Sequence, residues 1–331
     1  MKALLYTPIW FLQLFTTAKS FRDNPILGNA TLNRWGLHLT RLKVAHAIMR
    51  LRRRLLSSGI SAEDWQSFET QGYILKENFL PAEHFIALEA EIRAYRGEVR
   101  ECQQGDTQNH HTLLEPATLQ QLPQTMALFK IDYFKRLMRY TGGHLRQPFL
   151  YIEQVRNGVA AGGKDPQKNL HSDTFHPTMK FWFFLDDVPL EKGPFNYVPS
   201  SNQLTPERLA WEHKTSQYAC KHADSYAARG SFRFETNDLA QLKLPAPKTF
   251  VVKKNSLLMA DTFGIHARGQ AEAGSTRLAI WGMSRTNPFN LFPGTGFAFV
   301  DAAQYKIVKA LRDWEDYKAA KHGRKSAWHK I

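Results

Sequence analysis

Two short segments of the chain carry histidine and aspartate at spacings that can hold a metal ion. In Leu170-His171-Ser172-Asp173 the histidine and the aspartate are two residues apart, and in an extended segment such residues project to the same side. Taken alone, this pair is better explained as a surface histidine and a turn aspartate. The second segment runs from Asp261 to His266, which lies 93 residues past Asp173, far enough for the chain to cross several strands and return.

Two imidazoles and one carboxylate on one face of an octahedral metal favour non-haem Fe(II). Three positions then stay open, two for the keto and carboxylate oxygens of a 2-oxo acid and one for dioxygen. Asp173 fills the position that an alanine or glycine would open to a halide, so hydroxylation is expected rather than halogenation. We therefore predict that His171, Asp173 and His266 are the metal ligands and the catalytic residues.

Arg277 is the candidate for binding the 2-oxo acid. It lies 11 residues past His266 and leads into an apolar run over residues 278–281. A charged residue that enters a buried strand needs a partner. A cosubstrate carboxylate would be one, because the guanidinium group can bind it through two parallel hydrogen bonds. A salt bridge to a nearby acidic residue is the plain alternative.

Four further side chains are weaker candidates. Lys180 would touch the 2-oxo acid if it faces the metal, although a single lysine on a strand is usually solvated. Gln154, on the strand before the metal segment, would line the cosubstrate site if its strand faces that way. Arg229 and Arg233 could meet an acidic group on the substrate, although a solvated face is the ordinary explanation for both.

Short apolar runs separated by turns follow residue 149, and they indicate a β-sandwich or barrel. The expected strands are residues 149–155, 179–185, 195–198, 250–252, 256–259 and 278–283. Residues 201–245 interrupt them with polar, partly helical sequence, which we interpret as a lid-like insertion. Before residue 149 we expect a helix over 36–56, a capped helix from Ser61, a strand at 73–75, a helix over 82–96 and a polar loop or flap over 100–125.

From about Trp65 to Thr286 the chain resembles the phytanoyl-CoA dioxygenase-like family of 2-oxoglutarate oxygenases. The likeness is carried by residues 68–75, His171-Ser172-Asp173, residues 193–202, residues 261–266 and Ser275-Thr276-Arg277. It implies a mainly β, double-stranded β-helix (jelly-roll) fold with flanking helices. It also implies Fe(II), 2-oxoglutarate and O2, a hydroxylated lipid-like or small-molecule substrate, and a distal 2-oxoglutarate carboxylate bound by Arg277 with help from Ser275. The family's P-G-S-H turn reads Pro199-Ser200-Ser201-Asn202 here, a departure that touches no predicted ligand.

The net charge of +14 belongs to the two ends of the chain. Residues 1–54 contain 10 Lys/Arg against one acid, residues 304–331 contain 8 against 3, and the stretch between them is neutral. We exclude a nucleic-acid groove, which would need a basic stripe in the central domain. The chain divides into a basic amphipathic extension (1–60), an oxygenase domain (61–303) and a basic C-terminal helix (304–331).

The extension is a candidate anchor on an anionic membrane surface. Its first apolar run, residues 3–15, is too short to span a bilayer, but Tyr6, Trp10 and Phe11 suit the headgroup zone. The helix over 36–56 would either lie on anionic lipid or pack its apolar stripe on the domain with its charges in solvent, and we weigh the two evenly. The stripe comprises Leu37, Val44, Ile48, Leu51 and Leu55.

Two other functions compete with an oxygenase. The first is a non-catalytic jelly-roll module that binds a ligand or a membrane, which three intact ligand positions argue against. The second is a zinc-dependent hydrolase built on the same residues. Cys102 and Cys220 show no disulfide pattern, so we expect a cytoplasmic protein, peripheral on the inner face of a membrane if the extension binds lipid. The sequence leaves the substrate and the oligomeric state open.

Overall fold

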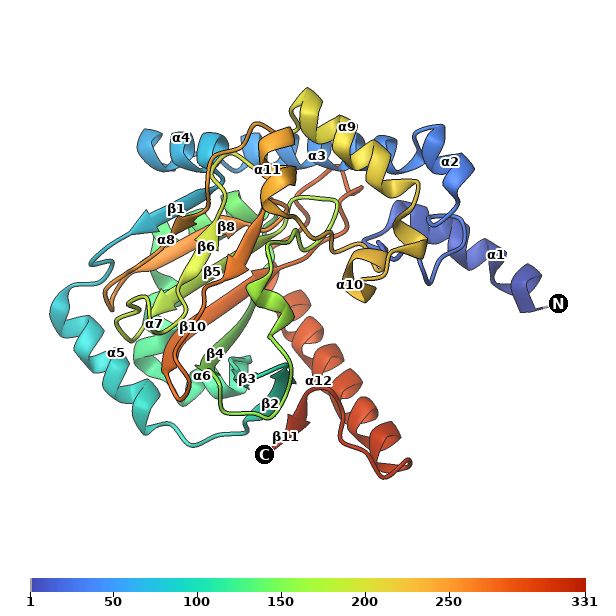
Figure 1. Cartoon of the computed structure of the whole chain (residues 1–331). Helices are drawn as coiled ribbons and strands as arrows, with labels where there is room; N and C mark the ends of the chain where they lie inside the picture. The colour runs from blue at the N-terminus through green and yellow to red at the C-terminus, as the bar shows by residue number, and fades with distance from the viewer. Residues whose placement is uncertain (1) are drawn as a thin grey trace.

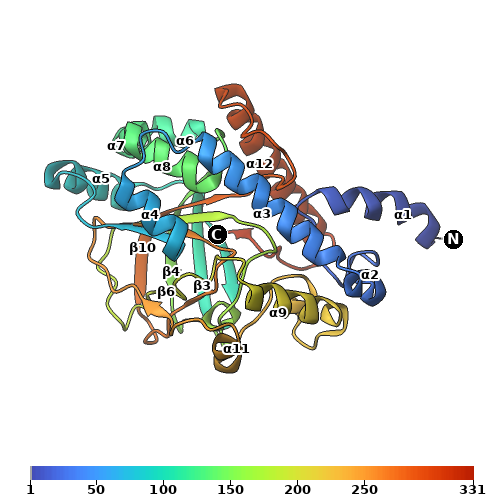
Figure 2. The same ribbon diagram turned by 90° about the horizontal axis from the view of Figure 1, so that it is seen from above.

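Two antiparallel sheets form the centre of the molecule and helices lie around them (Figures 1 and 2). The computed structural model describes residues 2–331, and side chains from Tyr6 onward. The larger sheet has the strand order β1-β8-β5-β10-β4-β3-β2-β11, and the smaller has the order β7-β6-β9. The strands are β1 (Tyr73–Lys76), β2 (Arg100–Gln104), β3 (Thr107–Leu113), β4 (Phe149–Arg156), β5 (Met179–Phe184), β6 (Phe195–Tyr197), β7 (Lys248–Thr249), β8 (Leu257–Asp261), β9 (His266–Arg268), β10 (Thr276–Ser284) and β11 (His329–Lys330).

The helices precede, interrupt and follow the strands. They are α1 (Lys2–Leu12), α2 (Ala30–Arg34), α3 (Leu37–Leu55), α4 (Ala62–Gln71), α5 (Ala82–Ala94), α6 (Pro116–Gln120), α7 (Pro123–Lys130), α8 (Asp132–Gly142), α9 (Pro206–Ser216), α10 (Ser225–Ala228), α11 (Thr236–Gln241) and α12 (Ala298–Ala320). The Ser61 side chain accepts a hydrogen bond from the Asp64 amide and caps α4, as its sequence predicts. The insertion at 201–245 contains α9, α10 and α11.

The two sheets pack face to face through apolar side chains. Trp182 and Phe184 of β5 and Leu258 of β8 share one cluster with Phe195 and Tyr197 of β6. The opposite face of the larger sheet packs against α5, α7 and α8 in a second cluster. This arrangement is the double-stranded β-helix with flanking helices that the family resemblance implied.

Strand β10 carries the cosubstrate candidate into the space between the sheets. It pairs with β4 on one side and β5 on the other, with Arg277 opposite Val155 and Trp281 opposite Trp182. Successive side chains of a strand point to opposite faces. Leu278 and Ile280 therefore pack toward the helices, while Arg277 and Trp281 face the inner cavity.

The expectation of a polar loop or flap over residues 100–125 is wrong. Strands β2 and β3 form a hairpin there, and β3 pairs with β4 from Gln108 opposite Arg156 to Leu113 opposite Tyr151. The strand lacks the usual apolar alternation because its inward side chains, Asn109 and His111, line the polar cavity. Their buried positions need hydrogen-bonding groups rather than aliphatic ones.

Helix α3 packs on the domain with a face that its sequence does not predict. Leu42, Ala45 and Met49 are buried, whereas Val44 and Leu51 of the expected apolar stripe are exposed. The expectation that its charges are solvated is wrong for Arg41, Arg52 and Arg53, which are buried. Arg53 forms an ion pair with Asp261 on β8 (Nη2 to Oδ2, 2.9 Å) and donates to the Thr141 carbonyl.

Both ends of the chain carry exposed apolar side chains on helices that project from the sheets (Figure 1). Around α1 these are Tyr6, Ile9, Phe11, Leu12 and Phe15, and on α12 they are Phe299, Ile307, Leu311, Trp314 and Tyr317. None of the described helices is both long and apolar enough to cross a membrane.

Candidate metal centre and cosubstrate pocket

Backbone hydrogen bonds bring the two metal-ligand segments together. His171 and His266 each donate an amide hydrogen to the other's carbonyl at 2.9 Å, and the Asp173 amide donates to the Thr262 carbonyl at 2.9 Å. His266 opens β9 of the smaller sheet, and Asp173 lies shortly before β5 of the larger one. The site therefore sits where the two sheets meet, and the fold itself fixes its three residues.

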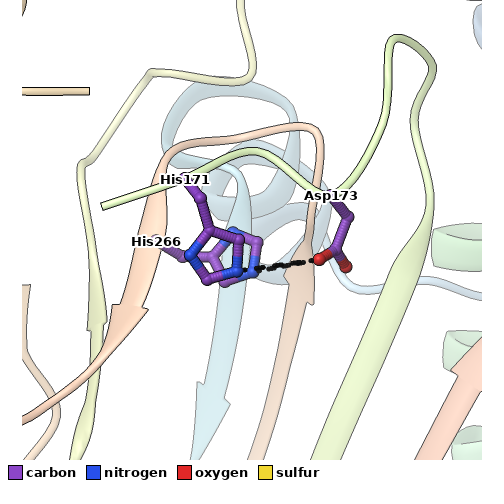
Figure 3. Close-up of side chains that lie close together, drawn as sticks. All are labelled: His171, Asp173 and His266. Carbon is purple, nitrogen blue, oxygen red and sulfur yellow. Dashed lines mark ion pairs between the residues drawn. The ribbon is translucent and has the colours of Figure 1, made fainter. Parts of the chain in front are cut away.

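The three side chains point toward one centre (Figure 3). Asp173 Oδ1 lies 3.8 Å from His171 Nε2 and 3.7 Å from His266 Nε2. One potential ligand atom from each residue lies within 4.8 Å of the others, and no other such group occurs in the described part of the chain. All three residues are buried.

Each histidine is already oriented as a metal ligand requires. Nδ1–H of His171 donates to the Asn169 carbonyl and Nδ1–H of His266 to the Gly264 carbonyl, both at 2.8 Å. These bonds leave the lone pair on Nε2, and neither buried Nε2 atom has a hydrogen-bond partner. A buried polar atom without a partner costs free energy, and a metal ion is the partner that would satisfy both nitrogens at once.

The protonation states also suit a metal. Burial lowers the pKa of His171 well below its usual value and that of His266 to about 4, so both rings are neutral near pH 7. Burial alone would raise the pKa of Asp173, but Lys180 and the two histidines hold it well below its usual value. Neutral imidazole and ionised carboxylate are the forms that bind metals.

A cavity of about 350 Å³ opens beside these residues and contains Arg277. Arg277 is 6% exposed, and its Nη1 donates to the Gly193 carbonyl at 2.6 Å. No acidic side chain forms an ion pair with it among residues 6–331, so the salt-bridge alternative does not account for its burial. Burial and the neighbouring Arg268 lower its pKa to about 10, which still leaves it charged near pH 7.

Two of the three other predicted cosubstrate residues lie away from this cavity. Lys180 lines it, and its Nζ lies 2.7 Å from Asp173 Oδ2, the oxygen that does not face the histidines. Gln154 faces the opposite side of β4 and lines a different cavity. The Ser275 hydroxyl donates to the Glu272 carbonyl and is not among the cavity-lining residues.

Several residues that line the cavity are not predicted by the sequence. Arg268 is held by Asp165 and Asn109, each at 2.8 Å, and His111 lies 3.2 Å from Glu153. Arg268 lies two residues past His266 on an extended segment, where residues at this spacing project to the same side. This spacing is therefore a signal that Arg268 lies near the proposed metal ligands. The sequence gives no such signal for His111, because its strand β3 lacks apolar alternation.

The sequence model described as phytanoyl-CoA dioxygenase (PhyH) matches residues 68–239, just over half of the chain. The chain belongs to the phytanoyl-CoA dioxygenase family. This family consists of Fe(II)- and 2-oxoglutarate-dependent oxygenases, so the chain is an enzyme of that superfamily, and iron, 2-oxoglutarate and O2 are its cofactors. The expectations for family, fold and cofactors are thereby confirmed. His171 and Asp173 lie inside the PhyH match, while His266 and Arg277 lie beyond its end.

Several solved structures are similar to this PhyH-family chain. The α-ketoglutarate-dependent epimerase SnoN of nogalamycin biosynthesis is 16% identical, covers 67% of this chain and 80% of its own, and has a TM-score of 0.43. The carbocyclase SnoK of the same biosynthesis is 19% identical over 69% and 84%, with a TM-score of 0.46. HygX of Streptomyces hygroscopicus, with nickel and 2-oxoglutarate bound, is 14% identical over 69% and 88%, with a TM-score of 0.43. No curated protein matches the chain.

Proposed function

We propose that this oxygenase hydroxylates an unactivated C–H bond of a lipid, lipid-linked or other small molecule, with His171, Asp173 and His266 as its iron ligands. The observation that carries the proposal is the pair of buried, unpartnered Nε2 atoms facing Asp173 Oδ1. Bound iron supplies the oxidation, in which O2 and 2-oxoglutarate give succinate, CO2 and one hydroxyl oxygen on the substrate.

The surrounding side chains would orient the Asp173 carboxylate, bind 2-oxoglutarate and limit water near the metal. Lys180 holds Asp173 Oδ2, so that Oδ1 alone faces the histidine nitrogens and the carboxylate is a one-oxygen ligand. That leaves more positions open for cosubstrate than a two-oxygen carboxylate would. Arg277 binds the distal carboxylate of 2-oxoglutarate, since it is buried in the same cavity and has no acidic partner among the described side chains. Trp182 and Phe195 give the cavity an apolar wall that limits water near the metal.

Hydroxylation is tested with the purified, Fe(II)-loaded chain, 2-oxoglutarate and fractionated lipid and metabolite extracts. We expect succinate formation to rise in one fraction, together with a product that is heavier by one oxygen atom. Mass spectrometry after reaction under 18O2 would place the labelled oxygen in that product. A product that lacks the label, or that has lost two hydrogens, would contradict hydroxylation, and the absence of 2-oxoglutarate binding would contradict the assigned cosubstrate site.

We further propose that the enzyme works at an anionic membrane surface, which α1 and the helix η1 (Gln13–Phe15) that follows it would contact. Phe11, Leu12 and Phe15 are 54%, 64% and 56% exposed, and apolar side chains clustered in this way favour burial in an interface. Residues 1–54 also carry ten of the basic residues of the chain, of which Arg41, Arg52 and Arg53 are buried and would not meet lipid. Deleting the whole extension would be a poor test, because it removes Arg53 from its ion pair with Asp261.

Substitution of the exposed side chains tests the membrane proposal without that damage. We expect Phe11→Ser, Leu12→Gln and Phe15→Ser together to weaken binding to phosphatidylglycerol vesicles about 100-fold, since each loses roughly 1 kcal/mol of apolar burial. The control is Ile86→Gln with Leu190→Gln, two side chains that are each 64% exposed elsewhere on the surface. Vesicle flotation measures both. Equal binding by the triple variant and the control would refute an α1 contact.

A further inference from the structure

Four cationic side chains from four separate segments surround Asp173. Lys180 of β5 is its ion-pair partner, and Lys19 of the N-terminal extension donates from Nζ to its backbone carbonyl. Arg233, in the 201–245 insertion, has its backbone paired with that of His171 in an isolated bridge. Arg285, just past β10, lines the same cavity as Asp173. We call Lys19, Lys180, Arg233 and Arg285 the basic cluster.

The members of the basic cluster lie close enough to repel one another. Lys19 and Lys180 contact the backbone carbonyl and the carboxylate of Asp173, and the Arg233 backbone pairs with that of His171, two residues before it. Like charges held together in a partly buried site raise the free energy of the fold unless an anion neutralises them. Such an arrangement is usual where a negatively charged ligand binds.

The acidic groups of the protein neutralise this cluster only in part, through Asp173 on Lys180 and Asp224 at the limit of ion-pair distance from Arg233. Arg233 is 11% exposed, and its nearest acid, Asp224, lies 4.0 Å from Nε. Its Nε and Nη2 are buried and make no hydrogen bond among the described residues. Arg285 is exposed to the cavity and forms no ion pair within 4.0 Å in residues 6–331. The remaining cavity acid, Glu153, is held by His111.

The cosubstrates do not neutralise it either, if the site works as proposed above. A bound divalent metal would be the main partner of the Asp173 carboxylate. Without metal, that carboxylate is the closest anion to Lys19 and Lys180. The two carboxylates of 2-oxoglutarate would go to the metal and to Arg277. Three cations beside Asp173 are then left, on Lys19, Arg233 and Arg285, and of these Arg285 is among the residues that line the cavity.

We infer that the substrate carries an oxyanion group, such as a phosphate, that binds Lys19, Arg233 and Arg285 beside the metal. The two guanidinium groups offer forked pairs of N–H donors and the lysine offers a compact charge, a combination that fits an oxyanion with several acceptor oxygens. Lys19 and Arg285 lie outside residues 68–239, the part of the chain that the family model matches. The inference rests on the proposed function, because it assigns the substrate of that same site.

Calorimetric titration of inorganic phosphate, sulfate and acetate into the full-length protein tests the subsite. Titrations are made with metal-free protein and with protein loaded with Mn(II) and 2-oxoglutarate. We expect phosphate to bind both forms, and Arg285→Gln and Lys19→Gln each to weaken binding about tenfold, as the loss of one charged hydrogen bond does. Arg285→Lys should recover part of the loss. The control is Arg229→Gln, which removes a 60%-exposed cation of the same insertion and should leave phosphate binding unchanged.

The source of the oxyanion is tested in parallel with phosphatidylglycerol vesicles. A headgroup source predicts that Arg285→Gln weakens vesicle binding as well as phosphate binding, whereas a soluble phosphate ester predicts that it weakens phosphate binding alone. Either pattern supports the subsite. Absence of phosphate, sulfate and acetate binding, or equal binding by Arg285→Gln, Lys19→Gln and Arg229→Gln, would overturn it. Because the metal-free titration needs neither iron nor 2-oxoglutarate, failure of the proposed oxygenase chemistry would be seen separately, as absent 2-oxoglutarate turnover.

Discussion

His266→Ala is expected to abolish 2-oxoglutarate turnover and to weaken metal binding more than about 100-fold, beyond what loss of a hydrogen-bonding neighbour of a ligand costs. The variant removes one of the three proposed protein ligands, and no other cluster of three potential ligands occurs in the described part of the chain. Anaerobic titration with Fe(II) and 2-oxoglutarate, followed by succinate formation, measures both effects.

The fold should survive this substitution. The Nε2 atom of His266 has no protein partner, and Nδ1 makes a single hydrogen bond to the Gly264 carbonyl, so few contacts are lost in the metal-free state. Wild-type protein with metal at 100 times its Kd should gain about 2.7 kcal/mol, or roughly 5 °C in Tm. At the same metal concentration the variant should gain no more than about 0.4 kcal/mol.

The matched control for His266 is His176→Ala. His176 is equally buried and lies three residues past Asp173, but it is not among the cavity-lining residues, and its Nδ1 bonds the Pro177 carbonyl. It should keep the metal-dependent rise in Tm. A metal-dependent rise that persists in His266→Ala would show that the ion binds elsewhere and would reject the proposed ligand set.

Three residues of the candidate site, His171, Asp173 and Arg277, were predictable because they follow local rules. His171 and Asp173 share one side of an extended segment, and Arg277 begins an apolar strand, as pattern alone indicates. His266 needed the family resemblance, since 93 residues of chain separate it from Asp173 and no local pattern fixes such a distance. The two backbone hydrogen bonds between His171 and His266 join residues that are far apart in the sequence, so no local pattern predicts them.

The structure differs from the sequence predictions where polar residues are buried instead of solvated. Strand β3 was expected to be a loop because its buried positions are Asn109 and His111, which face a polar cavity. Arg53 lies neither on lipid nor in solvent, the two alternatives weighed for its helix, because it is buried against Asp261, which is 208 positions away in sequence. Lys19 also contacts a residue that is distant in the sequence, because its Nζ donates to the Asp173 carbonyl. A buried polar side chain is identified by its partner, and a single sequence does not reveal partners that lie far along the chain.

Arg277→Leu is expected to raise the KM for 2-oxoglutarate about 100-fold, because two charged hydrogen bonds to the distal carboxylate are worth about 3 kcal/mol together. The kcat at saturating 2-oxoglutarate should change less, since His171, Asp173 and His266 are untouched. Steady-state succinate formation, measured over a wide range of 2-oxoglutarate concentrations, separates the two constants.

This variant should not unfold the protein, in contrast to loss of Arg53. Arg277 has no acidic partner within the described residues, so leucine leaves no buried carboxylate unpaired and relieves the repulsion from Arg268. Replacing Arg53 would leave Asp261 buried without its cation, a change that costs roughly 3–5 kcal/mol for such pairs. In thermal melts, Arg53→Leu should therefore lower the Tm, whereas Arg277→Leu should change the Tm little or raise it.

Selectivity among 2-oxo acids gives the decisive test of Arg277. 2-Oxopentanoate has the length of 2-oxoglutarate but lacks the distal carboxylate, so wild-type enzyme should strongly prefer 2-oxoglutarate. In Arg277→Leu that preference should fall by about the same 100-fold, because the site no longer distinguishes a carboxylate from a methyl group. If the variant keeps the preference, another cation binds the carboxylate. Arg268 would then be the candidate, since it lines the same cavity, although Asp165 and Asn109 already hold its guanidinium group.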